Sequence, residues 1–106
     1  LYADLEAGIS GSMSSALLPE KIAPVIDHFW NNEKDKAEEV YNSILPLINF
    51  ENRQCGFRAT KTVMKEGGVI KSDFCRDPIK PLDLDTKNLL LNYAKRYDLL
   101  SYNWGK

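Results

Sequence analysis

Apolar residues recur at helical spacing along most of the chain. The segment from Pro19 to Asn31 has an i, i+3, i+4, i+7, i+8 pattern, which predicts a helix with one buried face: Ile22, Val25, Ile26, Phe29 and Trp30. Asn32 is predicted to cap a second helix, whose inward stripe is Ala37, Val40, Tyr41, Ile44, Leu45 and Ile48. A third helix of this kind is predicted from about Thr86 to Leu100, with Asp85 as its cap. Its inward face is expected to carry Leu90, Tyr93, Ala94 and Tyr97.

Between these stripes lie a shorter helix and an extended segment. The shorter helix fits Phe57–Glu66, and the glycine pair at 67–68 is expected to end it. Residues 69–85 are predicted to form an extended connector, because Pro78 and Pro81 exclude a regular helix there. We expect Arg76 to tie this connector to helix ends or to carboxylates.

The N-terminal part of the chain differs from the rest. Residues 8–16 are mostly glycine and serine with weak alternation, so they predict a strand only if neighbouring strands supply its pairing. One strand cannot satisfy its own backbone donors and acceptors. Leu1 also lies inside an expected helix that no cap residue precedes. We therefore expect this chain to be part of a longer protein.

Composition narrows the possible partners. The chain has 106 residues, with 14 basic and 15 acidic side chains and a net charge of -1, which gives no reason to expect nucleic acid or an anionic membrane as partner. Its apolar runs are too short to span a bilayer. The two cysteines, Cys55 and Cys75, have neither zinc-site nor disulfide-framework spacing, so we expect reduced thiols in the cytoplasm.

Several stretches could carry chemistry. The stretch "GISGSMSSA" precedes a predicted helix start at Pro19, but it matches neither the dinucleotide-binding fingerprint nor a Walker loop. Two interpretations remain: a tightly packed strand and turn, or a simple anion-binding site at the start of the helix. His28 lacks a second histidine or a nucleophile nearby and is expected at the surface. Lys61 would need a desolvated site to form a Schiff base, and its charge-rich helix disfavours that role. We expect no metal and no cofactor.

Two motifs together show a family resemblance. "GISGSMSSA" resembles the final barrel strand of the dihydrodipicolinate synthase / N-acetylneuraminate lyase superfamily, and "RDPIKPL" resembles the Arg-Pro connector near its C-terminus. The order of helices between and after them matches as well, over nearly the whole chain. The stretch "CGFRATKTVMKEGGVIKSDFCRDPIKPLD" is most similar to the sugar-acid dehydratase branch, in particular the 2-keto-3-deoxy-L-arabonate dehydratases.

The resemblance implies an α/β fold, a (β/α)8 barrel with a C-terminal helical extension, of which this mostly α chain would be the last part. Residues 1–31 would end the barrel with its eighth strand and helix, and residues 32–106 would form the extension. A lysine on strand six would form an imine with a 2-keto acid substrate. No catalytic residue is then expected in this chain, whereas Ser12, Met13 and Ser14 would face the substrate at the reactive end of strand eight.

The resemblance also implies partners and alternatives. The chain would contact the remainder of its own barrel in a cytoplasmic homotetramer, and without its lysine it would be inactive. The alternative within the superfamily is that the protein is a dihydrodipicolinate synthase or a pyruvate-dependent aldolase. A helical interaction module and an anion-binding module are the alternatives of other classes.

Overall fold

The chain folds into helices joined by irregular segments. The computed structural model describes residues 1–105, and within them no strand forms. The elements are α1 (Tyr2–Glu6), α2 (Pro19–Trp30), α3 (Lys34–Phe50), a π-helical turn η1 (Glu51–Cys55), α4 (Phe57–Glu66), α5 (Leu84–Arg96) and α6 (Leu100–Asn103). The predicted helical character is confirmed, and the helix expected over Phe57–Glu66 has those bounds.

The segment predicted as a barrel strand has no regular structure here. Residues 9–15 are neither helical nor in a strand, and within the described chain no main-chain N–H from Ser10 to Ala16 donates a hydrogen bond. A strand is stable only when a neighbour satisfies its backbone groups. Residues 1–105 supply no such neighbour, so the condition on which a strand was predicted over 8–16 is not met within them, and no strand forms there.

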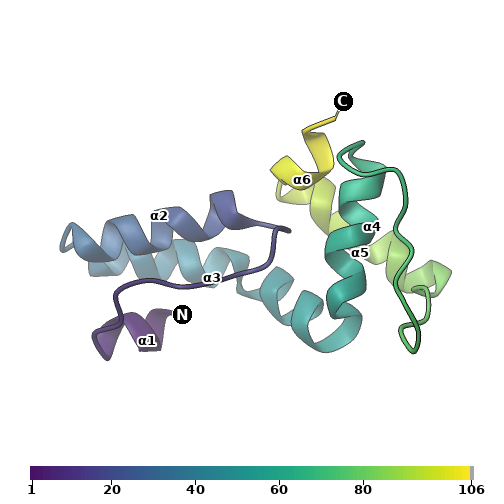
Figure 1. Cartoon of the computed structure of the whole chain (residues 1–106). Coiled ribbons are helices and arrows are strands. Elements are labelled where there is room, and N and C mark those ends of the chain that lie inside the picture. Colours follow the sequence, from purple (N-terminus) through teal and green to yellow (C-terminus); the bar gives the residue numbers. More distant parts are fainter. Residues whose placement is uncertain (106) are drawn as a thin grey trace.

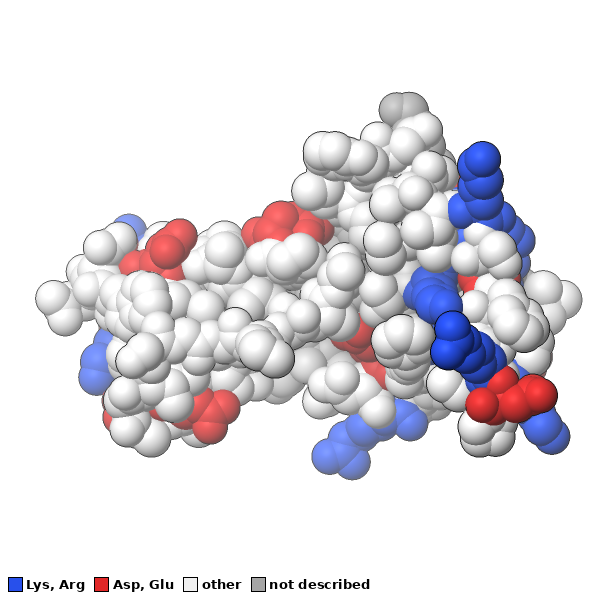
Figure 2. Space-filling view, viewed as in Figure 1, with Lys and Arg blue, Asp and Glu red and all other residues white. Residues whose placement is uncertain are grey.

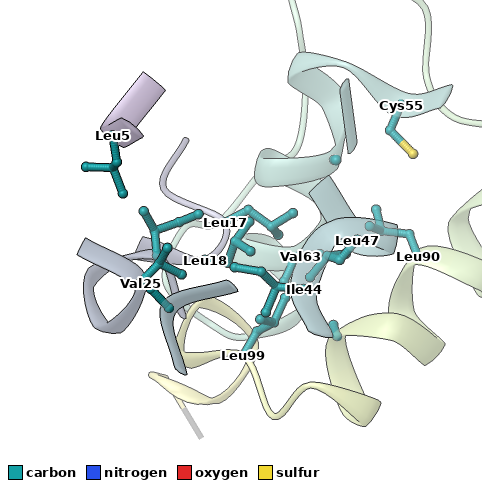
Figure 3. Close-up of a cluster of buried hydrophobic side chains, with 14 residues drawn as sticks. Leu5, Leu17, Leu18, Val25, Ile44, Leu47, Cys55, Val63, Leu90 and Leu99 are labelled. Carbon is teal, nitrogen blue, oxygen red and sulfur yellow. The ribbon is translucent and has the colours of Figure 1, made fainter. Parts of the chain in front are cut away.

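The helices form two groups that share one core (Figure 1). At one end α2 packs along α3, with α1 against both, and at the other end α4 packs against α5 and α6. Figure 3 shows buried side chains from both groups meeting between them, including Leu17, Ile44, Val63 and Leu99. Segment 8–16 crosses α3 on its way from α1 to α2, outside this core.

The predicted apolar stripes are mostly confirmed. Ile22 and Val25 of α2 are buried, as are Ala37 and Ile44 of α3. Trp30 is an exception, with 55% of its surface exposed, because α2 ends at this residue.

The junction after α2 differs from the prediction in its cap. Asn32 was expected to cap α3, but it adopts a left-handed backbone conformation with φ of 62°. This places Glu33 at the capping position. Asn tolerates the left-handed region better than most residues, so Asn32 reverses the chain between two helices rather than starting one.

The C-terminal helix is capped and ended by residues other than those predicted. Asp83, not Asp85, is the cap of α5, and its carboxylate accepts hydrogen bonds from the main-chain N–H and the hydroxyl of Thr86. These bonds hold the pKa of Asp83 below its usual value. The expected single helix to Leu100 is also wrong, because Asp98 has φ of 50° and separates α5 from α6.

Two long-range hydrogen bonds join the start of α2 to α6. The Ser101 hydroxyl, which is buried, donates to the Leu17 carbonyl at 2.8 Å. The Leu100 N–H donates to Glu20 Oε1 at 2.9 Å. These bonds join residues 84 and 80 positions apart in the sequence and therefore hold the two helix groups against each other.

Ser101→Ala is expected to destabilise the protein by about 1–2 kcal/mol, because the buried Leu17 carbonyl loses its donor. Urea unfolding followed by circular dichroism measures this change. Ser43→Ala is the matched control, since the Ser43 hydroxyl is exposed and bonds only within its own helix. Equal midpoints for the two variants would show that the Ser101 bond contributes nothing.

Candidate substrate-binding site

The predicted substrate-binding residues border a hollow of about 440 Å³, called the serine hollow below. Ser12, Met13 and Ser14 form one side of it. Glu51 and Asn52, from the π-helical turn η1, form part of the opposite side. The remaining lining residues are Leu1, Ser15, Leu18, Ile22, Tyr41 and Ile48. The fold thus brings the serine segment against a turn about 40 residues later, which the sequence analysis did not anticipate.

The side of this hollow formed by the serine segment is exposed to solvent. Met13 is 98% exposed, and Ser12 and Ser14 are exposed as well. Two hydroxyls here bond to the local backbone: the Ser15 hydroxyl accepts from the Leu17 N–H at 3.2 Å, and the Ser14 hydroxyl donates to the Ser15 carbonyl at 3.4 Å. The three predicted residues therefore form a rim rather than an enclosed pocket in residues 1–105.

The face around this rim carries little charge. The sequence has no acidic or basic residue from Ala7 to Pro19. Figure 2 shows a broad uncharged surface over α2, α3 and the segment that crosses them, while Lys and Arg side chains gather over α4 and the connector. An exposed, uncharged backbone with free N–H groups is a surface that another strand can pair with.

Glu51 is the site residue that the sequence analysis missed. The residue is 7% exposed, and Thr60 Oγ1 donates to its Oε1 at 3.1 Å. A signal was present, because Glu51 continues the stripe of Ile44, Leu47 and Ile48 at helical spacing. An acidic residue on an apolar stripe indicates a buried carboxylate with a specific partner.

A second hollow, of about 350 Å³, lies under the connector. Two of its three basic side chains make structural contacts: Arg58 donates to the carbonyls of Cys55 and Lys80, each at 3.0 Å. Lys87 pairs with Glu66 at 3.3 Å. Asp73, Asp77 and Lys80 line it as well, and their side chains make no hydrogen bond or ion pair within residues 1–105.

The connector is held by α4 and not by the residue predicted for this role. Arg76 is exposed, and its side chain makes no hydrogen bond or ion pair within residues 1–105. Arg58 holds the Lys80 carbonyl, and Lys61 Nζ donates to the Phe74 carbonyl at 2.9 Å. The prediction for Arg76 is thus wrong, because basic residues on α4 already reach the connector backbone.

Two further candidate residues have structural contacts. Lys61 Nζ lies 5.5 Å from the centre of the Phe57 ring in addition to its bond with Phe74, so its charge is satisfied and it is not a desolvated amine. His28 is half-buried rather than fully exposed, and its Nδ1 lies 3.3 Å from Glu33 Oε1. Neither residue borders the serine hollow.

The two cysteines are free thiols in different surroundings. Cys55 is buried and lies in η1, and burial raises its pKa to about 11. Cys75 lies half-buried in the connector. Because the thiolate is the reactive form, Cys55 is protected both by burial and by its proton.

Iodoacetamide at pH 8 is expected to label Cys75 well before Cys55, and Cys55 is expected to react at comparable speed only after denaturation. Peptide mass spectrometry measures the two rates. Raising the pH toward 11 should increase Cys55 labelling as its thiolate forms, and Cys75→Ser provides the control for assignment. Labelling of Cys55 first at pH 8 would contradict its burial.

No set of three or more His, Cys, Asp or Glu side chains of residues 1–105 is arranged to hold a metal ion. No helix in the described part has the length and apolar character needed to cross a membrane.

The chain belongs to the dihydrodipicolinate synthetase family, whose model matches residues 2–96. It is similar to a protein from Azospirillum brasilense described as L-2-keto-3-deoxyarabonate dehydratase. The two are 42% identical over 105 residues, which cover 99% of this chain and 34% of the relative. The chain thus spans about a third of the length of that relative, and the family resemblance inferred from its motifs is confirmed.

Proposed function

We propose that this chain forms the C-terminal part of a Schiff-base lyase that dehydrates a 2-keto-3-deoxy sugar acid such as 2-keto-3-deoxy-L-arabonate. The observation that carries the proposal is the 42% identity over nearly the whole chain to the Azospirillum dehydratase. The match begins before the serine segment and extends past the connector, so it includes both motifs that pointed to the family.

In this proposal residues 8–16 become the eighth strand of a (β/α)8 barrel. The free N–H groups from Ser10 to Ala16 and the uncharged face around them support this placement. Residues 1–31 then complete the barrel, and residues 32–106 form a helical extension. The reactive end of such a barrel lies at the carboxyl ends of its strands, which puts Ser12, Met13 and Ser14 beside the substrate.

The reaction requires a lysine from the remainder of the barrel. Its amine forms an imine with the substrate's 2-keto group, and the imine accepts the electron pair released when a C3 proton is lost. The resulting enamine expels the neighbouring hydroxyl, which leaves as water after protonation. The hydrogen bond from the Lys61 ammonium to the Phe74 carbonyl supports a structural role for Lys61 instead. This chain contributes hydroxyl groups and part of the pocket wall.

The proposal includes the setting of the whole protein. It is a cytoplasmic homotetramer whose partners are a small-molecule 2-keto acid and the rest of its own barrel. It uses no metal or cofactor, and it binds neither nucleic acid nor membrane. The near-neutral net charge of this chain and its reduced thiols support this setting.

Turnover by the full-length protein tests the proposal. The protein is incubated with 2-keto-3-deoxy-L-arabonate, and products are identified by mass spectrometry. A dehydratase is expected to give a product that is lighter than the substrate by the mass of one water molecule. Release of pyruvate would indicate an aldolase. In a separate incubation with pyruvate and an amino aldehyde, their condensation would indicate a dihydrodipicolinate synthase. Either of these results in place of dehydration would contradict the proposal.

A further inference from the structure

The Glu51 carboxylate is buried in the wall of the serine hollow without an ion pair inside the described chain. The residue is 7% exposed, and no Lys, Arg or His of residues 1–105 lies within ion-pair distance of its carboxylate. Charged side chains are seldom buried this far unless a partner compensates them. The burial of Glu51 therefore requires hydrogen-bond donors.

One oxygen of this carboxylate is satisfied and the other is not. Oε1 accepts from the Thr60 hydroxyl at 3.1 Å. Oε2 has no partner in residues 1–105, and it is not among the side-chain oxygens there that are both sealed from solvent and unpaired. Glu51 lines the serine hollow and a neighbouring hollow of about 540 Å³. Oε2 is therefore an acceptor available to a ligand in these hollows.

The backbone around Glu51 holds this acceptor in place. Glu51 is the first residue of η1, and the Gly56 N–H donates to its carbonyl at 2.6 Å. Turns of π-helix are rare and occur often at functional sites. With its main chain fixed by η1 and its Oε1 fixed by Thr60, Oε2 has a defined direction.

We propose that Glu51 determines specificity by accepting hydrogen bonds from the hydroxyl-bearing end of the substrate. This inference rests on the proposed function. A carboxylate accepts but does not donate, so it suits a polyol chain and repels a second carboxylate. The substrate's own carboxylate then lies away from η1, while its hydroxyls lie between Glu51 and the serines at 12 and 14.

The test uses Glu51→Gln in the full-length protein. Gln keeps an oxygen for the Thr60 hydroxyl, but its amide nitrogen cannot accept from the substrate. We expect KM for the 2-keto-3-deoxy sugar acid to rise about 10-fold or more, the loss typical of a hydrogen bond to a charged group. Imine formation with pyruvate, which has no hydroxyl, is expected to change less than about 2-fold, measured by borohydride trapping.

Two further variants separate binding from folding. Thr60→Val frees Glu51 Oε1 and is expected to raise KM in the same direction but by less, because the carboxylate remains. Glu39→Gln removes an exposed carboxylate of α3 and is the matched control, with unchanged KM expected. Thermal unfolding of each variant shows whether it is folded.

The outcomes distinguish this inference from the function on which it rests. If the wild-type protein dehydrates the sugar acid but Glu51→Gln has the same KM, the role of Glu51 is refuted and the proposed function stands. If Glu51→Gln impairs pyruvate trapping as much as sugar-acid binding, its role is structural. If the wild-type protein dehydrates no sugar acid, the proposed function and this inference both fail.

Discussion

In the full-length protein, the amides from Ser10 to Ala16 are expected to exchange with solvent at least roughly 100-fold more slowly than in this chain alone, because pairing in a sheet adds about 3 kcal/mol or more to local opening. In residues 1–105 these N–H groups have no partner and should exchange almost as freely as in an unfolded peptide. Hydrogen exchange with mass spectrometry measures both samples.

The α3 helix supplies an internal control for this comparison. Amides near Ile44 and Leu47, both buried, lie in a regular helix in the chain itself and should be protected in both samples if both are folded. Fast exchange of residues 10–16 in the full-length protein would show that they do not join a sheet. That result would remove the barrel placement while leaving family membership intact.

Gly67→Ala is expected to destabilise the protein by about 2–4 kcal/mol, at the upper end of overpacking effects. A Cβ at this position would overlap the Ser101 carbonyl oxygen and would lie 2.7 Å from the Tyr102 carbonyl carbon. Both obstacles are backbone atoms of α6, so no side-chain rotation relieves the clash. The helix must move, and the Ser101 bond to Leu17 is lost with it.

Chemical denaturation of this chain with the Gly11→Ala variant as control tests the effect. Nothing lies within 4 Å of a Cβ built on Gly11 in the chain, so the added methyl group should leave its stability unchanged. Unfolding midpoints for Gly67→Ala and Gly11→Ala that agree within error would show that α6 is not packed as described.

The helices could be predicted from the sequence because their causes are local. Apolar spacing, Pro19 and the Gly67–Gly68 pair define α2 and α4 without reference to other parts of the chain. Features that depend on tertiary contacts could not be predicted. The break at Asp98 is one example, since it allows Leu99 to be fully buried between α5 and α6.

The candidate site was predictable on one side only. The serine segment was found through a motif resemblance, and in the proposed barrel its conformation would depend on strands that residues 1–105 do not include. The opposite wall depends on η1, whose π-helical geometry has no clear sequence signature. Arg58 and Lys61 show the same limit, because their basic flank was visible in the sequence but their contacts with the connector required the fold.

Borohydride trapping of a pyruvate imine in the full-length protein tests the central claim most directly. Reduction fixes pyruvate on the reacting lysine, and peptide mass spectrometry locates it. The account predicts one labelled lysine outside residues 1–106 and no label on this chain by itself. A labelled Lys61, or full-length protein that forms no imine while remaining folded, would contradict it.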